Sequence, residues 1–152
     1  SEGELSDIPN NSKVLVPNDG TNEARALFLL QAANLITLKE GVTYSKATKN
    51  DIESNPKNLQ ITEIESAQIP ISLSDAAIGV VNGNYALQHN LSAAIQYENI
   101  PEAEQEQYVN VVAVKSGNEE SEKTKALKKA ILSDAVKTYI QQKYNGSVIC
   151  VF

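Results

Sequence analysis

Apolar positions along the chain follow two different spacings, one typical of strands and one typical of helices. Continuous or alternating apolar runs predict strands at Lys13–Pro17, Leu59–Glu65, Ala77–Gly83 and Tyr108–Lys115. The first and the last of these runs are predicted to be buried, because apolar side chains dominate them. The length of 152 residues is enough for one domain or two small lobes.

Helical spacing and turn residues fill the intervals between the first three runs. A helix capped by Thr21 or Asn22 is predicted to run to about Asn34. Shorter helices are expected in SLSDAA and in NYALQHN. Strands that alternate with helices indicate an α/β fold with a mixed or parallel sheet.

The C-terminal part shows the same alternation. YENIPEAEQEQ is acidic and is interpreted as a solvated surface loop, which includes Glu98. Gly117 and Asn118 are predicted to open a helix with acidic residues early and lysines late, as the helix dipole favours. Ser133 is expected to cap a further helix that ends at Asn145-Gly146.

Composition excludes several classes of protein. The formal net charge of −6 and pI of about 4.8 argue against a nucleic-acid binder, which normally shows a basic surface. One cysteine, Cys150, excludes an internal disulfide and a cysteine-rich metal site, and the single histidine, His89, has no ligand partner at metal spacing. We expect no cofactor, and we expect no enzyme, because no nucleophile and base stand in a recognisable motif.

The first candidate site is the turn after Lys13–Pro17. In parallel sheets ligands bind beyond the carboxyl ends of strands, and this turn carries Asn18, Asn22 and the chain's single arginine, Arg25. Free N–H groups at a helix start and a two-pronged guanidinium both suit a carboxylate. The alternative is that Arg25 is a solvated helix residue that pairs with a nearby glutamate, with the asparagines serving as turn formers.

The second candidate site is VVNGNYA, after the Ala77–Gly83 run. Asn82 and Asn84 could hydrogen-bond both the amine and the carboxylate of a ligand, and Gly83 allows a tight turn. The alternative is an Asn-Gly turn that only caps the next helix. The glycine spacing does not match a phosphate-binding loop.

These two turns resemble those of a known family. KVLVPNDGTNEARALFLLQAANLITLKEGV is similar to the signature of the NlpA lipoproteins, the methionine-binding, substrate-capturing components of bacterial ABC importers. The resemblance continues through NPKNLQITEIESAQIPISLSDAAIGVVNGNYALQHNLS and YVNVVAVKSGNEESEKTKALKKAILSDAVKTYIQQKYNGSVICVF, nearly the whole chain beyond residue 12. It favours the ligand-binding interpretation of both turns.

The resemblance implies an α/β periplasmic-binding-protein clamshell of the second topological type. Residues 1–12 are then a linker or edge, 13–80 a second lobe, and 81–152 the C-terminal part of a first lobe with hinge crossovers. In the family a long segment precedes the VPND motif. The chain begins with Ser and contains no Met, so we expect a processed or truncated piece of an extracytoplasmic, membrane-anchored lipoprotein without its anchor.

The resemblance also assigns ligand-binding residues. Arg25 matches the arginine expected to hold the ligand carboxylate, and Asn82 the asparagine expected to hold the amino-acid backbone. Asn18 and Asn22 match the two asparagines of the family motif, and Tyr85 matches a family tyrosine. Gly20 departs from the pattern, because the family usually has proline there. The aromatic pocket that selects the ligand side chain belongs to the missing segment.

The function implied is an importer's solute-binding protein that captures methionine or a related amino acid or peptide and delivers it to a permease. One alternative is a sensory or regulatory ligand-binding domain of the same fold without transport. An enzyme on this fold is a further alternative. A half-built first lobe would leave strand edges uncovered, which favours dimerisation or strand exchange.

Overall fold

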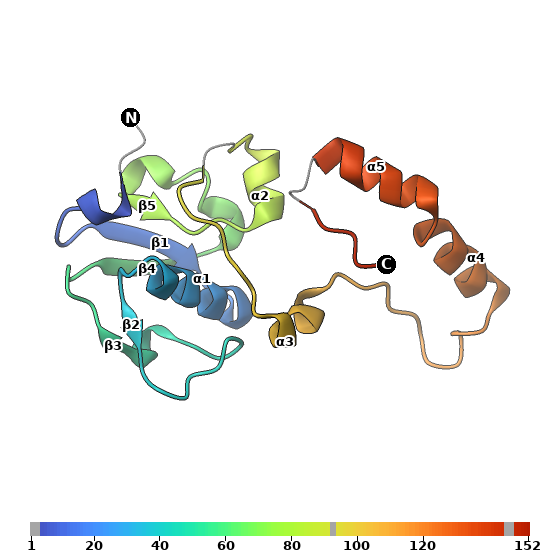
Figure 1. Cartoon of the computed structure of the whole chain (residues 1–152), viewed down its shortest axis with the longest axis horizontal. Helices are drawn as coiled ribbons and strands as arrows, with labels where there is room; N and C mark the ends of the chain where they lie inside the picture. Colours follow the sequence, from blue (N-terminus) through green and yellow to red (C-terminus); the bar gives the residue numbers. More distant parts are fainter. Residues whose placement is uncertain (1–3, 92–93, 145–147) are drawn as a thin grey trace. The chain divides into compact units, whose positions relative to one another are not determined.

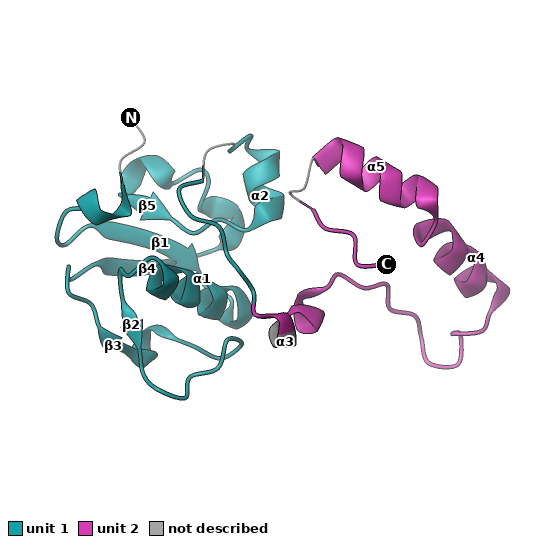
Figure 2. Cartoon of the chain, viewed as in Figure 1, with its two compact units in different colours: residues 1–100 teal, residues 101–152 magenta. Residues whose placement is uncertain are grey.

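The computed structural model describes residues 4–91, 94–144 and 148–152. The chain separates into two compact units, residues 1–100 and residues 101–152 (Figure 2). This division differs from the predicted division into lobes at residue 80, which stays a prediction. The candidate site lies within residues 1–100.

A small parallel sheet forms the centre of residues 1–100 (Figure 1). Strand β1 (Lys13–Pro17) lies between β4 (Gln60–Ile64) and β5 (Ile78–Gly79), and both neighbours run parallel to it. Four of the five β1 residues are buried, as their apolar run predicted. The two N-terminal strand predictions are confirmed, whereas the third run forms only the two-residue β5.

Helix α1 (Gly20–Ala32) follows β1 and packs on the sheet through its buried residues, which include Ala24, Leu27 and Leu30. Its N-cap is Asp19, whose carboxylate accepts the backbone N–H of Asn22 at 3.1 Å. The predicted cap at Thr21 or Asn22 was therefore wrong. Both residues lie inside the first turn, because the aspartate before them supplies a stronger, charged acceptor.

The remaining elements of residues 1–100 are short. Strands β2 (Thr37–Leu38) and β3 (Ile52–Ser54) form an antiparallel pair, and helix α2 (Gly83–Gln88) follows β5. Single 3-10 turns cover Leu5–Asp7, Lys49–Asp51, Ser66–Gln68 and Leu73–Asp75.

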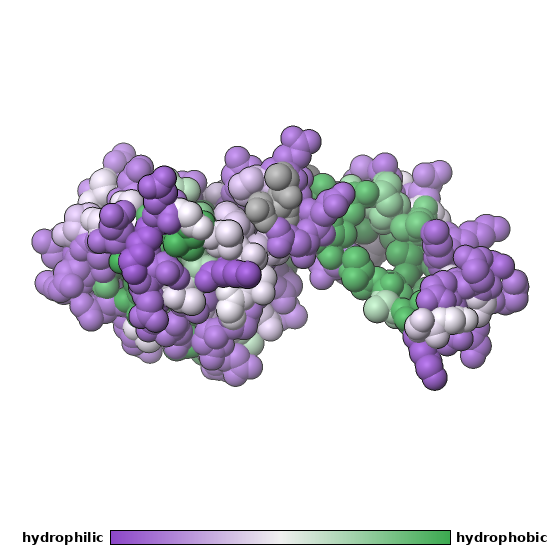
Figure 3. Space-filling view, turned by 90° about the horizontal axis from the view of Figure 1, so that it is seen from below, coloured by the Kyte–Doolittle hydropathy of each residue, from purple (hydrophilic) through white to green (hydrophobic). Residues whose placement is uncertain are grey.

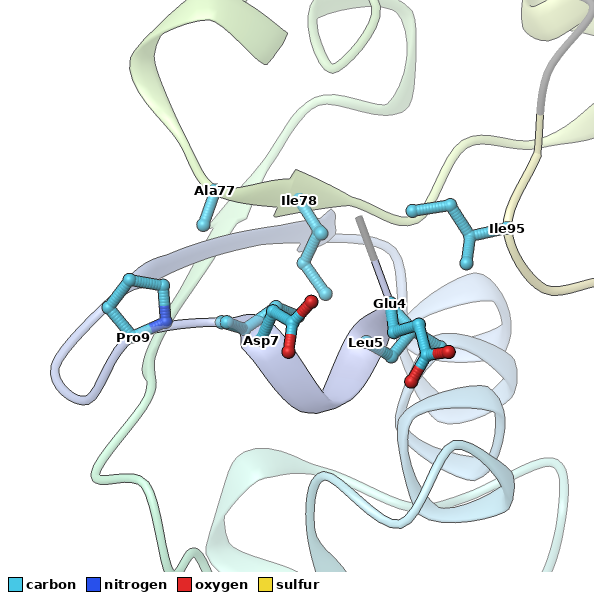
Figure 4. Close-up of a pocket in the computed structure, with 8 residues that line it drawn as sticks. Glu4, Leu5, Asp7, Pro9, Ala77, Ile78 and Ile95 are labelled. Carbon is cyan, nitrogen blue, oxygen red and sulfur yellow. The ribbon is translucent and has the colours of Figure 1, made fainter. Parts of the chain in front are cut away.

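A pocket lies between the first of these turns and the amino end of β5 (Figure 4). Leu5, Ile78 and Ile95 supply apolar walls, and Glu4 and Asp7 add carboxylates. It is at the opposite end of the strand from the carboxyl edge, where parallel sheets bind ligands.

Residues 101–152 consist of helices joined by extended segments. They are α3 (Glu102–Gln105), a 3-10 turn (Glu106–Tyr108), α4 (Glu122–Ile131) and α5 (Asp134–Tyr144). Part of the predicted acidic loop is thus helical. Helix α4 starts at the cap Ser121 rather than at Gly117-Asn118, because the Ser121 hydroxyl accepts the N–H of Thr124 at 3.3 Å.

The start of α5 agrees with its prediction, because the Ser133 hydroxyl accepts the N–H of Val136 at 3.4 Å. Its predicted end at Asn145-Gly146 lies outside the described residues. His89, which lies beyond α2, is exposed.

The predicted buried strand at Tyr108–Lys115 is absent. Residues 109–115 form no strand, and Val111 and Val112 expose 80% and 60% of their surface. Figure 3 shows apolar surface in the part of the chain formed by residues 101–152. A strand is defined by the hydrogen bonds of a neighbour, and the described residues supply none here.

Candidate functional site

The two predicted turns meet at one edge of the sheet. Strands β1 and β5 are parallel neighbours, so their carboxyl ends, Pro17 and Gly79, point to the same side. The ladder continues past β5, where the N–H of Val80 donates to the carbonyl of Leu15 at 2.9 Å. The next turn therefore begins beside the first turn of α1, and Asn82 Nδ2 donates to Asn22 Oδ1 at 2.9 Å.

Asn22 connects the two turns through its side-chain amide. Its Oδ1 accepts from Asn82 and also from Arg25 Nη1, at 3.0 Å. Its Nδ2 donates to Asp19 Oδ2 at 3.1 Å, which fixes the orientation of the amide. Arg25, Asn22 and Asn82 are thus one hydrogen-bonded group, although 60 positions separate Asn22 from Asn82.

Asp19 supports this group as an ionised carboxylate. Partial burial acts to raise its pKa, but hydrogen bonds from the Asn22 side chain and backbone and from Ser66 together hold the pKa of Asp19 below its ordinary value. The Ser66 hydroxyl reaches Asp19 Oδ2 at 3.1 Å from the segment after β4. All three strands of the sheet therefore contribute a neighbour to this edge.

Asn82 presents a buried acceptor. Among the residues that the structure describes, its Oδ1 is the buried side-chain atom that has no hydrogen-bond partner. Buried polar atoms are nearly always paired, and an unpaired one costs about 1–3 kcal/mol. The Asn82 Oδ1 atom therefore has the capacity to accept one further hydrogen bond.

The guanidinium of Arg25 is bound by a carboxylate that the sequence did not indicate. Arg25 Nε donates to both oxygens of Glu98, at 3.0 and 3.2 Å, and Nη2 donates to Oε2 at 2.6 Å. The Tyr44 hydroxyl also donates to Glu98 Oε1, at 2.6 Å. The ring of Tyr44 is placed by Phe28 of α1, with centroids 4.7 Å apart.

Glu98 is therefore not part of a solvated face, and that prediction was wrong for this residue. Its side chain exposes 20% of its surface, and that of Arg25 exposes 26%. Burial alone would raise the pKa of Glu98, but the hydrogen bonds from Arg25 and Tyr44 hold it below the ordinary value. Arg25 does pair with a glutamate, but with one 73 positions away rather than nearby.

The other predicted site residues lie around this group. Asn18 is exposed, and its backbone N–H continues the sheet edge by donating to the carbonyl of Ile64 at 2.9 Å. Tyr85 lies half-buried in α2, one turn after Asn82. Their side chains take no part in the hydrogen bonds described above.

A second carboxylate group lies at the other side of α1. Glu23 is buried, and its Oε1 accepts the backbone N–H of Lys49 at 3.1 Å. Burial, together with the neighbouring Glu63 carboxylate, raises the pKa of Glu23. Glu63 itself is paired with Lys49 Nζ at 2.5 Å, which helps to lower the pKa of Glu63.

Two features are absent from the part of the chain that the structure describes. No three His, Cys, Asp or Glu side chains gather there closely enough to hold a metal ion. None of the described helices has both the length and the apolar character needed to cross a bilayer.

Comparison with known proteins links these features to a family. The chain is 40% identical over 147 residues to the D-methionine-binding lipoprotein MetQ of Salmonella typhi, a match that covers 95% of this chain and 54% of that protein. The structure is similar to that of a nutrient-binding protein from Burkholderia cenocepacia bound to methionine, with a TM-score of 0.87 and 40% identity. That match covers 98% of this chain and 62% of the other.

A further similar structure is the substrate-binding protein of a methionine transporter from Streptococcus pneumoniae, with a TM-score of 0.83 and 38% identity, covering 95% of this chain and 56% of that one. The α/β fold is thus that of the substrate-binding proteins. The chain spans about half the length of the curated relatives it matches, 54% for the Salmonella protein. The family model described as NlpA lipoprotein matches residues 3–152, and the chain therefore belongs to the NlpA lipoprotein family.

Proposed function

We propose that this chain is part of an extracytoplasmic solute-binding protein that captures methionine, or a related small amino acid or peptide, for an ABC importer. The observation that carries the proposal is the hydrogen-bonded group of Arg25, Asn22 and Asn82 at the carboxyl edge of the sheet, where such sheets bind ligands. The names of the relatives support transport over a sensory role.

Each member of the group has a chemical role in this proposal. Arg25 provides a charge-assisted grip for the ligand carboxylate. Asn82 Oδ1, which is buried and has no hydrogen-bond partner among the described residues, receives the ligand ammonium. Asn22 bonds to both and holds them in register. Asn18 and Tyr85 are proposed as secondary contacts near the group.

Binding would be linked to closure of two lobes. In the proposed division, Arg25 belongs to the lobe of residues 13–80 and Asn82 to the start of the lobe part formed by residues 81–152. A ligand held by both residues favours the closed arrangement, because it binds that state more tightly. The exposed apolar residues beyond residue 100 are what a further segment of the first lobe would bury.

Delivery to a membrane permease and attachment as a lipoprotein follow from the same proposal. They are supported by the relatives, which are named as a D-methionine-binding lipoprotein and the substrate-binding protein of a methionine transporter. In this proposal the protein binds and releases its ligand without chemical change.

The test is a calorimetric titration with methionine. It uses the natural polypeptide that contains this chain and two variants of that polypeptide. Arg25→Ala should weaken binding by about 1.5–3 kcal/mol, the range for a hydrogen bond to a charged group. Arg25→Lys should recover only part of the loss, because lysine cannot make the two-pronged contact.

The matched control is Lys46→Ala, which removes an exposed cation of the same unit and should leave the affinity unchanged. Circular dichroism establishes that each variant is folded. Equal affinity for the wild type and a folded Arg25→Ala would refute the carboxylate assignment.

A further inference from the structure

We propose that Glu98 determines the net charge of the ligand that the Arg25 group accepts, so that the site selects a zwitterion over a simple carboxylate. The inference rests on the proposed function and adds to it a specificity-determining residue. Neither the sequence motifs nor the similarity to relatives indicated this residue.

Glu98 and Arg25 form a closely fitted ion pair. Glu98 occupies the Nε–Nη2 edge of the guanidinium with three hydrogen bonds of 2.6–3.2 Å, and the Tyr44 hydroxyl adds a fourth at 2.6 Å. Two-pronged, charge-assisted pairing of this kind is stronger than a hydrogen bond between neutral groups and fixes the relative orientation of the two side chains. Two residues that are distant from Glu98 in sequence, Arg25 and Tyr44, thus hold its carboxylate.

Glu98 is less exposed than the residues on either side of it. Residues 94–97 and residue 99 are exposed, whereas Glu98 turns inward and is mostly buried. The segment between α2 and α3 therefore delivers one carboxylate into the candidate site. Tyr44, which packs on Phe28 of α1, fixes the position of that carboxylate.

The charges of Arg25, Glu98 and Asp19 determine which ligand charge the site tolerates. The positive charge of Arg25 is already matched by Glu98 at contact distance, and the ionised Asp19 lies on the other side of Asn22. A ligand that brings only a carboxylate adds a further negative charge close to Glu98, where partial burial strengthens repulsion. A zwitterion adds a positive charge as well.

The ammonium of such a zwitterion has an acceptor close by. Asn82 Oδ1 is buried and unpaired among the described residues, and Asn82 is joined to Arg25 through Asn22. With the ammonium at this acceptor, the ligand is neutral overall and faces a neutral Arg25–Glu98 pair. Removing the charge of Glu98 should therefore favour anionic ligands in particular.

The experiment compares two ligands on the chain in its natural polypeptide. One is methionine, and the other is its des-amino analogue, which keeps the thioether chain and the carboxylate but lacks the ammonium. Calorimetry gives the ratio of the affinity for methionine to the affinity for the analogue. This ratio is measured for the wild type and for Glu98→Gln, whose side chain has the same shape without the charge. We expect this ratio to fall by at least tenfold in the variant, mainly because the analogue binds more tightly.

Tyr44→Phe is the matched control. It removes the hydroxyl that contacts Glu98 but leaves every charge in place, so both affinities should change together and the ratio should stay within about threefold. If Glu98→Gln does not fold by circular dichroism, Glu98→Ala replaces it, because the smaller side chain leaves no unpaired buried amide.

The outcomes separate this inference from the function on which it rests. A wild type that binds methionine and a folded variant with an unchanged ratio overturn the role of Glu98 and keep the proposed function. An equal loss for both ligands in the Glu98 variant shows that Glu98 only positions Arg25, which also overturns charge selection. A wild type that binds neither ligand overturns both proposals.

Discussion

Two apolar runs of similar composition have opposite fates in this molecule. Lys13–Pro17 is the central strand of a parallel sheet, and its Val14 is fully buried. Residues 109–115 are just as rich in valine, yet they form no strand, and Val111 exposes 80% of its surface. The comparison shows that a β-favouring pattern becomes a strand only where a neighbouring segment can share its backbone hydrogen bonds.

The same contrast holds for whole units. Every residue classed as buried among those that the structure describes lies between Ile8 and Ile69. Helices α4 and α5, in residues 101–152, contain none. Short helices without a buried face are marginal in water, so the cooperative stability of the chain should reside in residues 1–100.

The largest expected effect on the free energy of unfolding comes from replacing one leucine in each unit by alanine. Leu27 of α1 is fully buried, whereas Leu127 of α4 is 43% exposed. Leu27→Ala should lower the free energy of unfolding by about 2–5 kcal/mol, because it removes buried contacts and leaves a cavity. Leu127→Ala should change it by no more than about 0.5 kcal/mol.

Urea denaturation followed by circular dichroism measures both variants. A large loss for Leu127→Ala would break the comparison, because it would mean that the exposed face of α4 is covered in solution. An intermolecular cover would then be revealed by a dependence of the transition on protein concentration.

A smaller effect is expected from the first-turn glutamates of the two units, Glu23 in α1 and Glu122 in α4. Burial and Glu63 raise the pKa of Glu23, so the folded state disfavours its ionised form. Its contribution to stability is then greatest at low pH and is lost as pH rises through the folded pKa. The stability of Glu23→Gln should therefore rise relative to that of the wild type as the pH increases from acidic to neutral, because the uncharged glutamine has no ionised form to disfavour.

The measurement is the free energy of unfolding as a function of pH. Glu122→Gln is the matched control, because its side chain is 94% exposed, and its difference from the wild type should be small at every pH. A Glu23→Gln difference that stayed constant with pH would contradict the proposed cause.

The smallest effect is expected at glycines that precede helices. Gly20 is the first residue of α1, where proline is favoured, and a Cβ there meets nothing within 4 Å. Asp19, at φ −88° and ψ 136°, already has the conformation that a following proline requires. Gly20→Pro should therefore stabilise the chain by about 0.4–1 kcal/mol through the unfolded state.

Gly117, before α4, is the contrasting position because its φ of +90° is closed to proline. Gly117→Pro should distort that loop yet leave the main unfolding transition in place, since residues 101–152 contribute little to it. Thermal melts of the two variants test this difference. A lower melting temperature for Gly20→Pro would show that the turn before α1 needs the freedom of glycine.

The sequence alone determined the residues at the carboxyl edge of the sheet. Pro17 ends a strand, Asn18 to Asn22 form a turn, and the helix that follows must begin beside that edge. Local chemistry was sufficient for this, because strand runs, turn residues and helix starts are properties of adjacent residues. The exact cap, Asp19, was missed because several capping residues stand in a row.

Only the tertiary structure decided which side chains meet there. The bond between Asn22 and Asn82 exists because β5 pairs directly with β1. Glu98 came from a segment that appeared only acidic and solvated, and no local pattern distinguishes it from its neighbours. Its partner lies 73 positions away, and pairing over such distances is set by how the sheet, α1 and the loop that carries Tyr44 pack, rather than by local propensity.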